Sequence, residues 1–560
     1  MFNKLYTTQG EKLDGIPWDI YPRPQMRRNS YLNLNGTWEL TVEDVPTPFS
    51  IQVPFCPESQ LSGVNQHFPE GSTLVYRRRF HLPSDFNKGR VLLHIGAADQ
   101  IAEVYVNQTP VGRHEGGYTA FALDITHALK EDNVLEIRCT DDLRDRTMPY
   151  GKQTQHRGGM WYTPVSGIWQ SVWLESVPKH YIEELRIQNQ GYQVRITVRP
   201  ALEGTVQVEG LGEYPLKDGT VVIAPRDPHL WSPEDPYLYD FVIETEHDRV
   251  ESYFALRTVG TMILHGIPRF TLNGKPYFFH GPLDQGYWPD GIYTPASEEA
   301  FAQDILEMKK LGFNTMRKHI KVEPEEFYYQ CDKLGMVVFQ DMVNNGDYNF
   351  LRDTALPTVR IQRLPDKDMH KDPAARKRFL DGMEATVNQL KNHPCILYWT
   401  IFNESWGQFD SDAVFTRFKK LDSSRIVDST SGWFRQNKSD VDSRHIYFGP
   451  WTGLKVSDKP LVLSEFGGYA YPVKGHVFNT GNIYGYKVCK DEGQFQSAVK
   501  KLYREKVIPA AKKGLCAAII TQVSDVEDEI NGFLTYDRKV NKADMEKMLA
   551  IGKELQIAIK

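Results

Sequence analysis

Two apolar runs in this chain each end in a glutamate. Residues 394–403 lead to Asn403 and Glu404, and residues 460–464 lead to Glu465, which two glycines follow closely. Apolar runs rich in Ile, Leu, Phe and Trp are typical of strands that are buried on both faces. A carboxylate at the carboxyl end of a parallel barrel strand lies at the active face of the barrel. We therefore predict that Glu404 and Glu465 face each other across one sugar ring.

Cleavage of a glycosidic bond needs two such carboxyl groups. One protonates the leaving oxygen, and the other attacks the anomeric carbon or activates a water molecule. An enzyme that retains the anomeric configuration holds the two groups about 5–5.5 Å apart. The competing interpretation is that each glutamate only caps a helix or pairs with a cation. Two such strands in one chain favour catalysis.

Composition restricts the class of protein. The chain has 560 residues, 41% hydrophobic and 25% charged, with a net charge of −6. These values indicate a globular protein of about three domains without a basic surface for nucleic acid or anionic membranes. The six cysteines are scattered without a CxxC pair, so they indicate neither a disulfide framework nor a zinc site. We expect no cofactor and assign no metal ligand. No apolar run is long enough to span a bilayer, and residues 1–8 contain no signal core, so we expect a cytoplasmic protein.

The order of expected elements divides the chain into three parts. Residues 1–178 show short alternating runs separated by Pro, Gly, Asn and Asp, which indicates a β-sandwich of the jelly-roll type. Residues 179–260 are again strand-like and suit an immunoglobulin-like β-sandwich. Strands and amphipathic helices alternate over residues 261–560 and indicate a (β/α)8 TIM barrel. The eight expected barrel strands are 277–281, 313–317, 336–341, 395–402, 425–429, 445–448, 461–465 and 515–523.

Four short motifs in the first part carry a resemblance to a known family. They are residues 33–38, 76–80, 114–119 and 166–170, and they occur in the order seen in the sugar-binding domain of glycoside hydrolase family 2. Residues 230–239 resemble the motif of the second domain of that family, and we interpret their prolines as a rigid crossing loop without chemistry. Three parts in this order resemble the family over nearly the whole chain. The family contains β-galactosidases, β-glucuronidases and β-mannosidases.

The resemblance implies roles for the residues at the ends of the barrel strands. Glu404 matches the acid/base of the family, Glu465 matches the nucleophile, and Asn403 matches the amide that donates to the sugar 2-hydroxyl. His319 is expected to contact a sugar hydroxyl and Tyr447 to contact the nucleophile. Arg317 is expected to hold a carboxylate from below. Rim packing is the competing interpretation for these side chains.

Further candidates lie in loops. Asp284, Trp288 and Asp290 follow the first barrel strand, where a carboxylate could bind hydroxyls and an indole could stack on a sugar. These residues could instead form a turn, because Pro-Asp-Gly is a turn sequence. In the family, a loop of the first domain reaches the barrel mouth. We therefore expect Arg157 or Trp161 to line the pocket.

The chain departs from its relatives where the sugar is selected. Glucuronidases of the family carry an Asn-x-Lys pair that holds the substrate carboxylate, and this chain has Glu529-Ile-Asn531 at the matching position. A carboxylate there would repel a uronate, unless Arg157 supplies a cation from another direction. Gln522 also replaces a common tryptophan, and no clear counterpart of the magnesium ligands of large β-galactosidases is found.

We therefore predict a retaining exo-β-glycosidase of family 2 type with β-galactoside-like substrates. A β-hexuronidase, acting on glucuronides or galacturonides, is the first alternative. An inactive carbohydrate-binding protein is an alternative of another class, because fold alone does not determine function. The expected partners are a glycoside substrate and further copies of the same chain.

Overall fold

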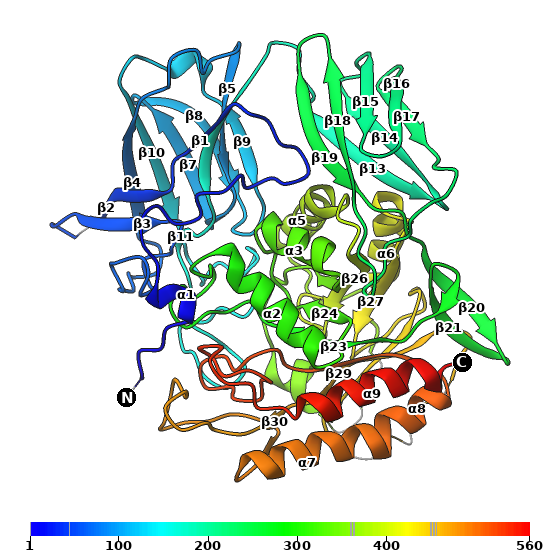
Figure 1. The fold of residues 1–560 in the computed structure, drawn as a ribbon. Coiled ribbons are helices and arrows are strands. Elements are labelled where there is room, and N and C mark those ends of the chain that lie inside the picture. The colour runs from blue at the N-terminus through cyan, green and yellow to red at the C-terminus, as the bar shows by residue number, and fades with distance from the viewer. Residues whose placement is uncertain are drawn as a thin grey trace.

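The computed structural model describes residues 2–43, 45–358, 361, 364–448, 451, 454 and 456–560. Two β-sandwiches lie side by side above a barrel in the view of Figure 1, and helices α7, α8 and α9 run along the side of the barrel away from the sandwiches. Each sandwich has its own cluster of buried apolar side chains, and the barrel contains a third and larger one. This arrangement matches the predicted fold class.

The first sandwich packs a four-stranded sheet against a six-stranded one, in the orders β1-β12-β5-β9 and β3-β2-β4-β10-β7-β8. Strand β2 shows why these segments form strands, since Trp38, Leu40 and Val42 are buried while Thr37 and Glu39 between them are exposed. The strands are β1 (Tyr31–Asn33), β2 (Gly36–Val42), β3 (Phe49–Val53), β4 (Thr73–Phe80), β5 (Arg90–Ile95), β6 (Ala98–Asp99), β7 (Ile101–Val106), β8 (Thr109–Glu115), β9 (Phe121–Asp124), β10 (Asn133–Thr140), β11 (Gly167–Ile168) and β12 (Val172–Val177). Helix α1 (Thr8–Glu11) precedes them.

The second sandwich has a three-stranded sheet, β13-β14-β17, and a four-stranded sheet, β16-β15-β18-β19. Its strands are β13 (Glu184–Gln190), β14 (Gln193–Arg199), β15 (Gly204–Val208), β16 (Gly212–Leu216), β17 (Thr220–Ile223), β18 (Tyr239–Thr245) and β19 (Arg249–Phe254). The small sheet of β20 (Val259–Leu264), β21 (Ile267–Leu272) and β22 (Lys275–Pro276) then leads to the barrel. The predicted boundary at 178/179 lies between β12 and β13, and the one at 260/261 lies inside β20. Both boundaries stay proposals.

The barrel is an eight-stranded parallel sheet in the order β27-β26-β25-β24-β23-β32-β29-β28. The strands are β23 (Phe279–Asp284), β24 (Thr315–Lys318), β25 (Val337–Asp341), β26 (Ile396–Asn403), β27 (Ile426–Ser431), β28 (Asp442–Ile446), β29 (Leu461–Gly467) and β32 (Leu515–Thr521). Each matches a predicted strand. The sixth begins and ends earlier than the expected 445–448, so Tyr447 follows the strand instead of ending it.

The helices around the barrel bury the apolar stripes that their sequences show. They are α2 (Glu298–Lys310), α3 (Glu325–Leu334), α4 (Leu356–Thr358), α5 (Pro373–Leu390), α6 (Ser411–Leu421), α7 (Glu492–Leu502), α8 (Ile508–Lys512) and α9 (Met545–Ala558). Helix α5 begins at Pro373 because the Asp372 side chain caps its first backbone N–H groups and a proline is tolerated in the first turn. The short gap between the sixth and seventh expected strands, 445–448 and 461–465, predicts a reduced or missing crossover helix. Residues 449, 450, 452, 453 and 455 of this gap lie outside the described residues.

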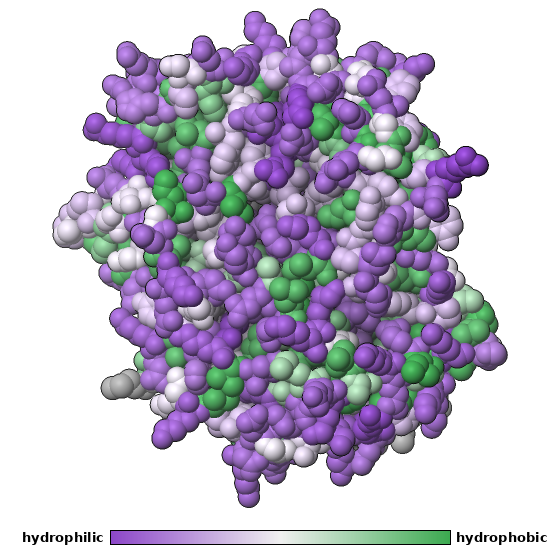
Figure 2. Space-filling view, viewed as in Figure 1, coloured by the Kyte–Doolittle hydropathy of each residue, from purple (hydrophilic) through white to green (hydrophobic). Residues whose placement is uncertain are grey.

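The expected crossing loop at residues 230–239 lies between β17 and the start of β18, which belong to the two sheets of the second sandwich, and it contacts the barrel. The buried indole of Trp231 donates a hydrogen bond to the backbone carbonyl of Asp332 at the end of α3, at 2.8 Å. On the outer surface, polar side chains cover most of the face shown in Figure 2, and apolar side chains form small separate groups. Within the described ranges, none of the helices has the length and apolar composition needed to cross a membrane.

Candidate active site

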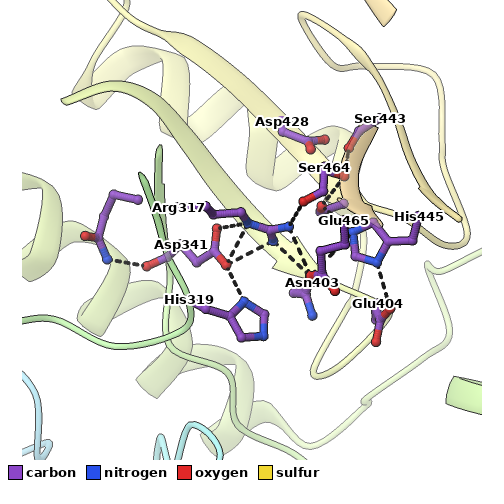
Figure 3. Close-up of polar contacts among 12 residues, drawn as sticks. Arg317, His319, Asp341, Asn403, Glu404, Asp428, Ser443, His445, Ser464 and Glu465 are labelled. Carbon is purple, nitrogen blue, oxygen red and sulfur yellow. Dashed lines mark hydrogen bonds and ion pairs between the residues drawn. The ribbon is translucent and has the colours of Figure 1, made fainter. Parts of the chain in front are cut away.

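Two carboxylates meet at one rim of the barrel. Glu404 directly follows β26 and Glu465 lies near the end of β29. One carboxylate oxygen of each, together with a ring nitrogen of His445, lies within 4.8 Å of the others (Figure 3). Retaining glycosidases hold their two carboxyl groups roughly 5–5.5 Å apart and inverting ones roughly 6.5–9.5 Å apart. The spacing therefore fits the first geometry.

Glu465 is held as an anion. Arg317 Nη1 lies 3.1 Å from its Oε1, the Tyr447 hydroxyl donates to its Oε2 at 2.5 Å, and His445 Nε2 lies 3.6 Å from Oε1. Burial alone would raise the pKa of Glu465, but His445, Arg317 and His319 lower it to about 2. An ionised carboxylate with this access to the rim can act as a nucleophile.

Arg317 organises the floor of the site, as Figure 3 shows. This fully buried guanidinium donates to Asp341 at 2.9 Å, to the Ser464 carbonyl at 3.0 Å and to Asn403 Oδ1 at 2.9 Å. Because Oδ1 of Asn403 is occupied in this way, its Nδ2 faces outward and has no hydrogen-bond partner among the described residues. The amide can therefore donate to a ligand beside Glu404.

Glu404 has a different neighbour. Its backbone adopts a φ of +49°, and His445 Nδ1 lies 2.7 Å from its Oε1. The other ring nitrogen of His445 lies 2.9 Å from Ser431 Oγ, which donates to Ser464 Oγ at 2.9 Å. His445 thus touches both carboxylates, and sequence reasoning missed it. The sequence spacing could have identified His445, because it lies two residues before Tyr447 and alternate residues of a strand share a face.

Glu404, His445 and Glu465 are, within the described residues, the one group of acidic, His or Cys side chains that could share a metal ion. Arg317 already supplies a positive charge to Glu465, which would oppose a bound cation. We therefore interpret the three residues as catalytic machinery.

His319 is oriented by Asp341, whose Oδ2 accepts from its Nδ1 at 2.8 Å. Burial lowers the pKa of His319 in spite of this partner, so the ring is neutral near pH 7. Nδ1 therefore carries the proton, and Nε2 is left for a ligand. Burial and the charge of Glu465 raise the pKa of Tyr447 well above its usual value, so its hydroxyl stays a donor.

Trp161 reaches the barrel rim from the first sandwich, and its role in lining a sugar pocket stays a prediction. Its ring stacks on Trp406 with centroids 5.1 Å apart and meets the edge of Tyr348 at 5.2 Å. Trp406 is only two residues beyond Glu404, so these rings form an aromatic wall beside the acid.

Arg157 does not point into this pocket, which corrects the other expectation for the loop. Its Nη1 pairs with Glu527 at 3.2 Å and with Asp528 at 3.0 Å, and its guanidinium lies 4.1 Å from the ring centroid of Phe2. Two carboxylates already neutralise this arginine, so it is not available as a cation for a uronate.

The three candidates after the first barrel strand are also bound elsewhere. Asp284 forms a buried ion pair with Lys318 at 2.6 Å, so it is not a free acceptor for sugar hydroxyls. The guanidinium of Arg538 covers the ring of Trp288 at 4.0 Å. Asp290 accepts hydrogen bonds from the backbone and hydroxyl of Thr7 at 2.8 and 2.6 Å. These contacts stabilise the loop and correct the expectation of a substrate role.

Two further charged residues belong to the pocket, of which Glu529 was expected from the sequence to repel a uronate and Lys152 was missed. Lys152, from the same loop as Trp161, holds its ammonium 4.8 Å from the ring centroid of Trp406. Glu529 accepts hydrogen bonds from the Tyr162 hydroxyl and from Asn531 Nδ2, the latter at 2.9 Å. Lys152 escaped detection because a single lysine in a polar loop carries no pattern.

Comparison with known proteins agrees with this architecture. The family model described as "Glycosyl hydrolases family 2, TIM barrel domain" matches residues 267–543. The model "Glycosyl hydrolase 2 galactose-binding domain-like" matches residues 54–164, and "Glycosyl hydrolases family 2" matches residues 177–257. Together they cover most of the chain in the expected order.

Three similar proteins illustrate the range of relatives. A β-galactosidase of Thermoanaerobacter pseudethanolicus is 23% identical over 499 residues, which cover 80% of this chain and 62% of that protein. The solved structure of a β-D-glucuronidase from Dictyoglomus thermophilum has a TM-score of 0.73 at 19% identity and covers 96% of this chain and 98% of that one. A family 2 β-galacturonidase from Eisenbergiella tayi, bound to galacturonate, has a TM-score of 0.69 at 19% identity, with 96% and 99% coverage.

The two structural likenesses establish the fold alone. The chain spans between 46% and 62% of the length of the β-galactosidases that it matches.

Proposed function

The chain belongs to glycosyl hydrolase family 2, and from that premise we propose that it is a retaining exo-β-glycosidase acting on terminal β-linked, galactoside-like sugars. The observation that carries the proposal is the placement of Glu404 and Glu465 at one barrel rim with carboxylate oxygens within 4.8 Å. The loop that brings Trp161 over the rim supports an exo mode of action, because it covers one side of the pocket.

The proposed reaction is a double displacement. Glu465 forms a bond to the anomeric carbon while the bond from that carbon to the glycosidic oxygen breaks, and Glu404 gives its proton to the departing oxygen. In the second step Glu404 takes a proton from water, the water oxygen bonds to the anomeric carbon, and Glu465 is released as a carboxylate. The two roles follow from the different surroundings of the two glutamates, since Arg317 and Tyr447 hold Glu465 ionised.

His445 supports the acid role of Glu404. Ser431 donates its hydroxyl proton to Ser464, so we infer that its oxygen accepts the proton on His445 Nε2. His445 Nδ1 lies 2.7 Å from Glu404 Oε1, so the proton between these two atoms is placed where the first step needs it, beside the leaving oxygen.

Unpartnered polar atoms around the carboxylates are suited to a sugar. Among the described residues, Asn403 Nδ2, Trp406 Nε1, both polar atoms of Gln522 and Asn531 Oδ1 are buried without a hydrogen-bond partner. Buried polar groups are normally paired, so such a group marks where a ligand completes the network. Asn403 would donate to the 2-hydroxyl, and His319 Nε2 would accept from another hydroxyl of the same ring.

A β-hexuronidase is the second candidate, because the pocket contains an ammonium group, Lys152, without an ion-pair partner within 4.0 Å among the described residues. Glu529 in the same pocket disfavours an anionic sugar. A panel of nitrophenyl β-glycosides (galactoside, glucuronide, galacturonide, mannoside and arabinoside) separates the two candidates.

The test of the mechanism uses two conservative variants. We expect Glu465→Gln to reduce turnover of aryl β-glycosides by at least about 10⁴-fold, because no nucleophile remains. We expect Glu404→Gln to lose about 10²- to 10⁴-fold for poor leaving groups and much less for dinitrophenolate, which needs no proton. Mass spectrometry after treatment with an activated 2-fluoro glycoside should find the label on Glu465.

Labelling of any other residue would refute the nucleophile assignment. Absence of turnover for every glycoside of the panel, together with absence of labelling, would support a carbohydrate-binding protein without catalysis.

A further inference from the structure

Lys152 is a buried cation without a fixed anionic partner. It lies in the segment between β10 and β11, and only 6% of its surface is exposed. Its ammonium lies 4.8 Å from the ring centroid of Trp406 and 5.9 Å from that of Trp161. Among the described residues, no carboxylate oxygen lies within the 4.0 Å that defines an ion pair with it. Burial of an unpaired ammonium is costly, so this position calls for a functional explanation.

Three carboxylates nevertheless act on this ammonium from a distance. Burial lowers the pKa of Lys152, and the charges of Glu529, Glu465 and Glu404, in that order of strength, oppose the shift. The geometry points to the same neighbours, because the ammonium lies 6.0 Å from the ring centroid of Tyr162, whose hydroxyl donates to Glu529. Trp406, over whose ring the ammonium lies, follows Glu404 by two positions, so Lys152 is close to both Glu529 and the catalytic rim.

Glu529 is held in place by two side chains, one of which is Tyr162, the neighbour of Lys152. Its side chain is buried, the Tyr162 hydroxyl donates to Oε2, and Asn531 Nδ2 donates to Oε1 at 2.9 Å. Two neutral donors thus orient the carboxylate. The neighbouring acids Glu527 and Asp528 pair with Arg157, whereas Glu529 is not in contact with a cation among the described residues.

We propose that Lys152 and Glu529 determine the specificity of the pocket by binding a hydroxyl group of a neutral sugar between them and rejecting a hexuronate. A hydroxyl can accept from an ammonium and donate to a carboxylate at the same time. The carboxylate of a hexuronate would satisfy Lys152 but has no proton to donate, and it would add a negative charge beside Glu529 and Glu465. This inference rests on the proposed glycosidase function and deepens it.

The alternative is that Lys152 binds the carboxylate of a uronide. If Lys152 were a carboxylate anchor, the enzyme would prefer uronides, and removal of Lys152 would weaken uronide cleavage far more than galactoside cleavage. The structure favours the neutral sugar because Glu529 is fixed by two donors and cannot turn away from the pocket without leaving Tyr162 and Asn531 unpaired.

The experiment measures kcat/KM for nitrophenyl β-galactoside and β-galacturonide with the wild-type chain, Lys152→Met, Glu529→Gln and the double variant. For the wild type we expect the galactoside to be favoured by about 100-fold or more. Lys152→Met should lower kcat/KM for the galactoside by about 100-fold, since a buried contact to the sugar is removed. Glu529→Gln should raise kcat/KM for the galacturonide and reduce the preference for the galactoside by about tenfold.

The double variant should lose less on the galactoside than the product of the two single losses, because each single change leaves a partner charge unbalanced. The exposed lysine Lys130 of the same sandwich provides the matched control, and Lys130→Met should change neither value. Circular dichroism and thermal melting identify any variant that fails to fold, and the milder Lys152→Gln then replaces Lys152→Met.

A wild-type preference for the galacturonide that Lys152→Met abolishes would overturn the inference while leaving the glycosidase function intact. The inference would also be overturned if neither Lys152→Met nor Glu529→Gln changed the ratio of kcat/KM between galactoside and galacturonide. Absence of wild-type activity on every glycoside of the panel, without labelling of Glu465, would instead overturn the proposed function and this inference with it.

Discussion

Glu465 shows how neighbouring residues set the chemistry of a single side chain. Both of its oxygens receive a donor, Arg317 on one side and Tyr447 on the other. Its pKa falls from the ordinary value of 4.5 to about 2, because His445 and Arg317 outweigh the effect of burial. The ionised form contributes stability that is present above about pH 4.5 and is lost as the pH falls toward 2.

The first prediction follows from this shift. Labelling of Glu465 by a dinitrophenyl 2-fluoro glycoside needs the carboxylate but not a proton donor. We expect the rate constant of labelling to stay constant from pH 7 down to pH 4, whereas an unperturbed glutamate would slow by roughly fourfold at pH 4. Mass spectrometry of samples quenched at successive times measures this rate constant. The Glu404→Gln variant should give the same flat profile, and a decline centred near pH 4.5 would contradict the ionised state that we assign.

At this scale, sequence reasoning can place a residue that ends a buried strand. Glu404, Glu465, Asn403 and His319 could be placed at one rim because parallel barrel strands all end there. Asp284 and Asp290 could not be judged in the same way. Their partners, Lys318 and Thr7, are 34 and 283 positions away in the chain, and no local pattern predicts such contacts.

At the scale of elements, the connection between β10 and β11, residues 141–166, is the segment that completes the pocket. Long connections without regular structure usually have a function. Gln153 donates to Asp99 of the first sandwich at 2.8 Å, and Tyr150 donates to the Gly346 carbonyl of the barrel at 2.9 Å. These anchors hold Trp161 against Trp406.

The second prediction concerns this connection. Replacement of Trp161 by alanine removes a stacked ring from the aromatic wall, and we expect kcat/KM for aryl β-glycosides to fall by about tenfold, in keeping with about 1.4 kcal/mol of lost contact. The rate of labelling of Glu465 at saturating reagent should change little, because the carboxylates are untouched. Tyr192, an aromatic residue exposed on the second sandwich, serves as the control, and Tyr192→Ala should behave like wild type. An unchanged kcat/KM for Trp161→Ala would place the ring outside the binding site.

Element prediction worked best where local chemistry marks both ends. Asp372 and Pro373 mark the start of α5, and its apolar spacing gives its length. Strand β28 is shifted because its polar residues, Asp442 and Arg444, join the sheet through backbone pairing with β29. An apolar pattern cannot detect a strand that is held mainly by its backbone.

At the scale of the whole molecule, buried ion pairs link the two sandwiches. Arg28, near the amino terminus, donates to Asp248 of the second sandwich at 2.7 and 2.9 Å and to Glu175 of the first sandwich at 3.1 Å. All three side chains are buried. Removal of one partner from such a network is costly because it leaves the other charges unpaired. The expected association of several copies stays a prediction.

The third prediction tests this link. We expect Arg28→Met to lower the free energy of unfolding by about 3–5 kcal/mol, because Asp248 and Glu175 lose a shared cation. Scanning calorimetry and limited proteolysis between the two sandwiches measure the effect. The neighbouring Arg27 is exposed, and Arg27→Met should leave the melting temperature nearly unchanged. Equal melting temperatures of Arg28→Met and Arg27→Met would show that the buried ion-pair network does not stabilise the packing of the two sandwiches.

The connection over residues 141–166 has an evolutionary consequence. Both glutamates belong to the barrel, whereas Lys152 arrives from a neighbouring sandwich that has its own apolar core. Recombination that exchanged only the amino-terminal sandwich would deliver new side chains to the sugar and leave the bond-breaking apparatus unaltered. Paralogues could thus change their substrate specificity while keeping the same catalytic residues.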